Sequence, residues 1–432
     1  MTTQLSPAKE PQDGARERTI APPPRSWSAP VVLLVFGFVA LGVFGLLAPS
    51  GETSTFGIAT SSDFFQIEPI ALPSRVVGIL LGLLCLVLAG VALAAVARHQ
   101  RPPVWLVATF GTAFVLGFLV WTVAGAQISF TQLLQGTLAL AAPLVFGSLS
   151  GILCERAGVV NIAIEGQMLA GAFMSAVVAS VSGNLYLGLI AAPLSGLAVG
   201  ALLALFTIRY LVNQIIVGVV LNVLVLGLTN FLLKRVLEPD PATWNSPGRF
   251  PNLKIPLLGD IPVIGPVVFT QTIVVYLMFA AVIIVHVSLF RTRWGLRVRA
   301  VGEHPQAADT VGIRVNATRV RNVLLGGFVA GLGGAYFTLG AVGTFSREMT
   351  AGNGFIALAA MIFGRWSPIG AFGAALLFGF ANNLQSVLGV IGTPIPSEFM
   401  LMAPYLATIF AVAGLVGRVR GPAAAGIPYE KG

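Results

Sequence analysis

Long apolar runs dominate this sequence, and each holds about 20 residues, the length that the hydrocarbon core of a bilayer requires. We predict eleven long spans, near residues 31–48, 76–97, 104–124, 133–153, 159–181, 185–208, 213–233, 269–290, 320–342, 369–389 and 399–417. A shorter apolar segment at 349–364 is a further candidate. The pattern predicts an all-α integral membrane protein, a polytopic helix bundle of about 11–12 transmembrane helices.

Three polar stretches interrupt or precede these runs. Residues 1–29 have few apolar side chains, and we expect them to form a disordered cytoplasmic tail. The connector 234–268 contains seven prolines and charges of both signs, which favours an ordered cap on the outer face. The connector 291–322 contains seven arginines against two acids, Glu303 and Asp309, which places it in the cytoplasm.

The middle of the 291–322 connector is compatible with a short helix. Pro305 can occupy a first helical turn, and Gly312 can end the helix. A short helix on the inner face offers a surface that another protein can bind. The alternative is a basic loop that only sets topology and touches anionic membrane lipid.

Arginine and lysine also orient the other spans, because their excess marks the cytoplasmic side. The expected inner positions include Arg98, Arg101, Arg209, Arg418, Arg420 and Lys431, so both termini are expected inside. Two inner termini require an even number of crossings, whereas eleven long spans are odd in number. We therefore predict that 349–364 crosses as a short helix and leaves Arg365 inside.

Composition supports a membrane protein and argues against an enzyme. The chain is 56% hydrophobic and 9% charged, whereas soluble chains carry about 25% charged residues. The net charge of +9 gathers at the ends of apolar runs and does not indicate nucleic-acid binding. The sequence contains no phosphate-binding loop and no HExxH or GxSxG motif, so we expect no bound ATP, cofactor or metal, and no catalysis.

Polar residues within the spans are candidates for the translocation path. Asn161 and Glu165 are four residues apart and would share one helix face. A carboxylate there either faces a polar path through the bundle or ties its helix to the next turn or to Arg156. Asn222 and the cluster of Asn382, Asn383 and Gln385 either line the path or hold helices together. Glycines between 326 and 340 favour close helix packing.

Several motifs resemble those of a known family. Gln306-Ala307-Ala308-x-x-x-Gly312 resembles the Glu-Ala-Ala-x-x-x-Gly signature of permease subunits in ATP-binding-cassette (ABC) importers, with glutamine in the first position. The preceding segment, with Arg299, Gly302, Glu303 and Pro305, resembles the permeases for branched-chain amino acids, simple sugars and nucleosides. The segments 155–166, 354–364 and 426–431 are similar to the nucleoside group.

The resemblance covers residues 133–432 and implies a permease core of about 9–10 helices there, preceded at 30–132 by an extension of about three helices. It implies that a separate ATPase binds ATP and docks on the 291–322 connector. The residues implied in this coupling are Arg299, Gly302, Glu303, Pro305, Gln306, Ala307, Ala308 and Gly312.

The same resemblance implies two further partners, a second homologous permease that would form a heterodimer and an extracellular substrate-binding lipoprotein. The expected activity is import of nucleosides, with purines favoured, across the cytoplasmic membrane. A permease for simple sugars or branched-chain amino acids is one alternative. A secondary transporter that works without an ATPase is another.

Overall fold

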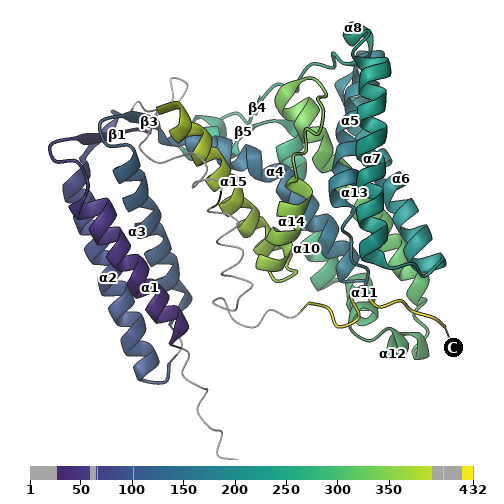
Figure 1. The fold of residues 1–432 in the computed structure, drawn as a ribbon, viewed down its shortest axis with the longest axis horizontal. Helices are drawn as coiled ribbons and strands as arrows, with labels where there is room; N and C mark the ends of the chain where they lie inside the picture. Colours follow the sequence, from purple (N-terminus) through teal and green to yellow (C-terminus); the bar gives the residue numbers. More distant parts are fainter. Residues whose placement is uncertain are drawn as a thin grey trace, which may run out of the picture. The chain divides into compact units, whose positions relative to one another are not determined.

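A computed structural model of the chain describes residues 27–58, 65, 67–100, 102–391, 402 and 421–431 (Figure 1). Within this part of the chain, ten helices are long and apolar enough to cross a membrane. They correspond to ten of the eleven long spans, which confirms the prediction of an all-α polytopic membrane protein. The predicted span at 399–417 and nearly all of the predicted tail at 1–29 lie outside the described residues.

The helices are, in chain order, α1 (Ser28–Val39), α2 (Ser74–Ala97), α3 (Val104–Thr122), α4 (Phe130–Glu155), α5 (Ile164–Ser182), α6 (Leu185–Ala204), α7 (Gln214–Leu232), α8 (Pro241–Trp244), α9 (Ile264–Val268), α10 (Ile273–Arg291), α11 (Arg293–Glu303), α12 (Pro305–Thr310), α13 (Val315–Ala335), α14 (Asn353–Phe363) and α15 (Pro368–Ile391). Wider π-helical turns extend four of them, at Ala40–Leu46, Leu205–Arg209, Leu233–Leu237 and Tyr336–Val342. The strands are β1 (Thr53–Gly57), β2 (Ile70–Pro73), β3 (Gln127–Ser129), β4 (Leu253–Lys254) and β5 (Thr270–Gln271).

The chain forms two compact units. The first comprises Met1–Leu47 and Gly78–Phe118 and therefore holds α1 and most of α2 and α3. Phe114 of α3 packs edge-on against Phe36 and Phe44, with ring centroids 5.4 and 5.1 Å apart. Aromatic contacts of this kind hold α1 and α3 together.

The second unit comprises Ala48–Val77 and Leu119–Gly432. Its central helix is α4. Of the apolar stretch of this helix, 89% is buried inside the protein, the largest share among the described spans. The strands β1, β2 and β3 form a small sheet, in which β1 is antiparallel to β2 and parallel to β3. The predicted boundary at 132 between extension and core rests on resemblance and stays a prediction.

Glycines bring α6 and α13 into direct backbone contact. A Cβ added at Gly327 would lie 2.4 Å from the carbonyl oxygen of Gly196, and one at Gly331 would lie 2.3 Å from that of Ala192. Side chains at these positions would force the two helices apart. The contact therefore requires small residues, as is common where membrane helices pack closely. The expected close packing of this glycine-rich span is confirmed.

The 234–268 connector is ordered, as predicted, and contains α8, β4 and α9. The side chain of Asn245 bonds both the N–H and the C=O of Phe345, and the N–H of Phe250 donates to the C=O of Leu339. The connector therefore caps the end of the second unit opposite α11 and α12 (Figure 1). Which side of the membrane it faces stays a prediction.

The segment 349–364 does not form a complete spanning helix. Its helix, α14, has 11 residues, which gives a length of about 16 Å, half of a bilayer core. The loop before α14 starts beside Asn245 at the capped end, and Arg365, just after α14, lies beside Arg156 at the opposite end. Loop and half-helix together therefore connect the two ends of the unit, where we expected one short crossing helix.

Candidate functional site

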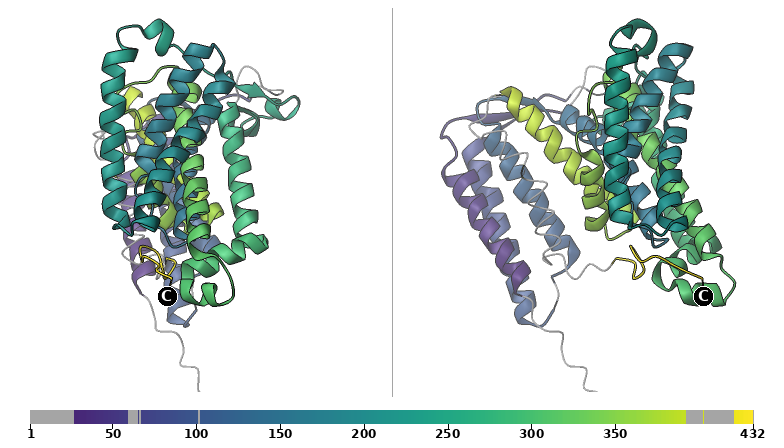
Figure 2. Two further views of the ribbon diagram at one scale, coloured as in Figure 1. Left: turned by 90° about the vertical axis from the view of Figure 1, so that its right-hand side faces the viewer. Right: turned by 45° about the vertical axis from the view of Figure 1, so that its right-hand side comes forward.

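The 291–322 connector folds into two short helices at one end of the second unit (Figure 1 and Figure 2). The prediction for α12 is confirmed, because Pro305 occupies its first position and Gly312 follows it with a φ of +85°. The structure adds α11, which we did not predict. Gln306 and Ala307 are exposed on α12, whereas Ala308 is 3% exposed and packs inward.

The helix α11 packs directly on the turn between α4 and α5. A Cβ at Gly302 would lie 2.2 Å from the carbonyl oxygen of Arg156, so only glycine permits this approach. The guanidinium groups of Arg156 and Arg299 lie 5.6 and 5.2 Å from the ring centroid of Phe290, which is cation–π geometry. Burial lowers the pKa of Arg156, while the negative charge of Glu303 opposes that effect.

The same turn holds the loop between α14 and α15. Arg156 donates to the carbonyl oxygen of Trp366 from Nε and Nη2, at 3.2 and 3.0 Å, and the indole Nε1 of Trp366 donates to Glu155 at 2.5 Å. Arg365 and Trp366 have φ of +57° and +53°, a conformation that costs about 1–3 kcal/mol for residues other than glycine. These hydrogen bonds therefore fix a strained turn in place.

Glu165 caps the start of α14. Its Oε1 accepts from Thr350 Oγ1 at 2.6 Å and from the N–H of Gly352 at 2.9 Å, and its Oε2 accepts from the N–H of Gly354 at 2.6 Å. A carboxylate at a helix N-terminus satisfies unpaired N–H groups and complements the helix dipole. Of the two roles considered for this carboxylate, the structure shows a tie between helices, made to α14 and not to Arg156.

Asn161 lies before α5 and not within it, so the prediction that it shares a helix face with Glu165 is wrong. Its Oδ1 accepts from the N–H of Ala163, a local turn bond that competes with helix formation. Its Nδ2 donates to Gln167 Oε1 and Ser150 Oγ, at 3.0 and 3.2 Å. Asn161 therefore joins a fully buried polar cluster between α4 and α5.

The remaining amide candidates fall into two places. Asn222 accepts from the N–H of Gly166 and donates to the C=O of Ile162, and so ties α7 to the start of α5. Asn383 donates to the C=O of Leu133 near the other end of α4, about 25 Å along that helix from Ser150. Asn382 and Gln385 are half-buried close to Asn383. The structure thus does not gather the predicted path residues around one site.

A C-terminal segment that we had matched only by resemblance crosses the connector end of the unit. We call residues 421–431 the C-terminal strap. Its Ala424 N–H donates to the C=O of Gly302, and its Ile427 C=O accepts from Arg319 at 2.9 Å. Tyr429 is 8% exposed and packs in one apolar cluster with Val301 of α11, Ala308 of α12 and Val315 of α13.

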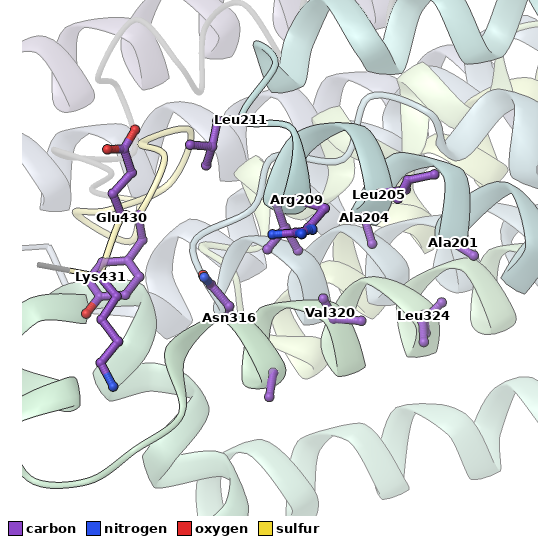
Figure 3. A pocket seen from close by; sticks show the side chains of 13 residues that line it. Ala201, Ala204, Leu205, Arg209, Leu211, Asn316, Val320, Leu324, Glu430 and Lys431 are labelled. Atoms are coloured by element: carbon purple, nitrogen blue, oxygen red, sulfur yellow. The ribbon is translucent and has the colours of Figure 1, made fainter.

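The strap also forms one wall of a groove of about 860 Å³ against α6 and α13. Figure 3 shows Glu430 and Lys431 across this groove from Arg209 and Asn316. The buried Arg319 was predicted only as one of the connector's positive charges, yet it is 2% exposed. Nothing in its local sequence signals burial, because its partner Ile427 lies in the strap.

Comparison with known proteins identifies relatives of most of the chain. The family described as "Branched-chain amino acid transport system / permease component" matches residues 133–419. The guanosine ABC transporter permease NupQ of Bacillus subtilis is 43% identical over 316 residues, which are 69% of this chain and 97% of NupQ. The nucleoside ABC transporter permease NupC of Lactococcus lactis is 42% identical over 298 residues, 67% of this chain and 93% of NupC.

A putative glucose ABC transporter permease of Haloferax volcanii, TsgC13, is 34% identical over 308 residues, 66% of this chain and 92% of TsgC13. The two organisms with NupQ and NupC each have a second relative, NupP and NupB, at 25% and 26% identity. No solved structure gives a significant match to the chain.

Proposed function

This chain belongs to the branched-chain amino acid transport system permease family, and we propose that it is the membrane-spanning subunit of an ABC importer for nucleosides. The observation that carries the proposal is the identity of 43% and 42% to two nucleoside-type permeases over nearly their whole length. Its relatives are transport components and not enzymes. The guanosine named for NupQ favours purine nucleosides as substrates.

We propose that the ATPase docks on α12, which makes the connector end the cytoplasmic face and leaves the 234–268 cap outside. The exposed face of Gln306 and Ala307 supports this role, because Ala308 and Gly302 are used for packing inside the unit. Movement of α12 would reach α14 through the contact of Gly302 with the Arg156 turn. Asn161, Glu165, Asn222, Asn382, Asn383 and Gln385 would then act mainly by fixing helices that border the path.

The second permeases NupP and NupB in the organisms that have NupQ and NupC support a heterodimer of two homologous permeases. An extracellular binding lipoprotein would deliver the nucleoside to this pair. ATP would be bound by the ATPase, with no cofactor on this chain.

Purification of the chain from its native membrane tests the partner set. We expect an ATPase and a second permease to co-purify, and Ala307→Tyr to abolish ATPase association because a bulky ring would occupy the docking face. Ala242→Tyr is the matched control, because Ala242 is exposed on α8, a short helix that also begins with proline, at the capped end. Equal ATPase recovery with both variants would contradict docking on α12.

Uptake by the reconstituted complex tests the substrate. Labelled guanosine should enter only with ATP present, and unlabelled nucleosides should compete while glucose and leucine should not. Competition by glucose would support the alternative that the chain is a sugar permease, which the similarity to TsgC13 also favours. A chain that purifies alone and still transports would establish a secondary transporter.

A further inference from the structure

Three arginines surround a cleft beside α12. The cleft has a volume of about 390 Å³ and is lined by Arg297 of α11, Arg314 of the loop before α13, and Arg321 of α13. All three side chains are exposed. They lie between the connector helices and the first turns of α13, so any protein that covers α12 from this side reaches them.

The positive charge of this arginine cleft has no counterpart within the described chain. No carboxylate lines the cleft, and neither ion pair formed among the described residues includes one of the three arginines. The connector's own acids are turned to the C-terminal strap. Glu303 accepts from the N–H of Ala423, and Asp309 faces the hydroxyl of Tyr429.

The surroundings of the cleft are those of a protein interface and not only of a charged surface. Val311 lies in its wall and is 75% exposed, and Trp294 contributes an indole ring. Protein interfaces are enriched in aromatic and arginine side chains that lie beside apolar contacts. Gln306, at the position where the docking signature carries glutamate, supplies no charge. Charge pairing at this surface therefore depends on the arginines.

We propose that an acidic patch of the ATPase subunit inserts carboxylate side chains into the arginine cleft. This inference rests on the proposed function. Guanidinium groups bind carboxylates through two parallel hydrogen bonds, which fixes orientation as well as adding affinity. The contact polarity is then arginine on the permease and carboxylate on the ATPase.

Salt and charge reversal test the proposal on the purified complex in neutral detergent. Raising NaCl from about 0.1 M to about 1 M shortens the screening length from about 10 Å to about 3 Å. We therefore expect less ATPase subunit to stay bound to the wild-type chain at the higher salt concentration. Arg297→Glu, Arg314→Glu and Arg321→Glu should each weaken association at least about tenfold, as close interfacial charge pairs do. Arg321→Lys keeps the charge but cannot form the two parallel hydrogen bonds, so it should retain only part of the association.

Arg291→Glu is the matched control, because it makes the same charge change at an exposed arginine of the connector that does not line the cleft. It should bind ATPase like the wild type. If a reversal fails to fold, Arg321→Gln and the wild-type salt titration still decide the question. Reversal of an acidic ATPase residue to lysine should rescue Arg321→Glu.

The outcomes separate this inference from the proposed function. A wild-type chain that recovers no ATPase overturns both. An ATPase that binds wild type and all three reversals equally, at any salt, overturns the cleft contact alone. Association that requires added phosphatidylglycerol in the wild type would assign the cleft to a lipid headgroup and overturn the carboxylate contact.

Discussion

Replacement of Glu165 by glutamine is the sharpest test of how α14 is held. The carboxylate accepts three hydrogen bonds, two at Oε1 and one at Oε2. A glutamine can keep the bonds from Thr350 and Gly352 at its carbonyl oxygen, but its amide group then meets the N–H of Gly354. Two donors cannot pair, so one charge-assisted bond is lost.

The magnitude follows from those contacts. A hydrogen bond to a charged group contributes about 1.5–3 kcal/mol, and a negative charge at a helix N-terminus about 0.3–1 kcal/mol more. We therefore expect Glu165→Gln to destabilise the protein by about 2–4 kcal/mol, as the sum of these two effects. The start of α14 should loosen, and nucleoside uptake should fall with it.

Thermal unfolding in detergent, followed by tryptophan fluorescence, measures the first effect, and uptake by the reconstituted complex measures the second. Glu238→Gln is the control, because it makes the same chemical change at an exposed position, where we expect no shift. An unchanged unfolding midpoint together with unchanged uptake would refute the capping argument. An unchanged midpoint with uptake lost would instead place Glu165 on the translocation path.

Two further substitutions test the connector end. Gly302→Ala should destabilise the protein by about 1–3 kcal/mol through overpacking against Arg156. Gly373→Ala, where an added Cβ meets nothing within 4 Å, should not lower the midpoint in the same unfolding assay. Equal midpoints of the two variants would contradict the contact of Gly302. Tyr429→Ala should release the C-terminal strap and remove the hydrogen-exchange protection of the Ala424 amide. Tyr429→Phe should keep that protection. If Tyr429→Ala retains it, the apolar cluster does not hold the strap.

Hydropathy predicted the membrane spans well because the length of an apolar run is a property of the local sequence. It failed at the start of α5, where Asn161 bonds its own backbone and delays the helix to Ile164. It also missed α11, because four of its eleven residues are charged and the segment resembles a loop until the helix is placed against the bundle. At the start of α5 the decisive interaction is a polar contact, whereas α11 buries an apolar face of Gly295, Val298, Val301 and Gly302 that is too short to be read as a membrane span.

The partners of the polar residues were beyond sequence reasoning for a different reason. Glu165 pairs with a turn 185–189 residues away, and Trp366 meets Glu155 across a separation of 211 residues. Spacing along the chain is informative only for residues within a few turns of one helix. The alternatives for Glu165 could be stated from sequence, but its hydrogen-bond partners could be found only in the fold.

Both ends of α14 are attached to one short segment of the chain. Arg156 and Glu155 hold its C-terminal turn through Trp366, and Glu165, ten residues further on, holds its first N–H groups. The connector helix α11 rests on the same segment at Gly302. A displacement of α11 that moves the Arg156 turn must therefore carry α14 as a unit or break charge-assisted bonds at one of its ends. Since those bonds are among the strongest available to a protein, movement of α14 as a unit is the lower-energy course, and the half-helix is the element best placed to convert motion at the connector into a change within the bundle.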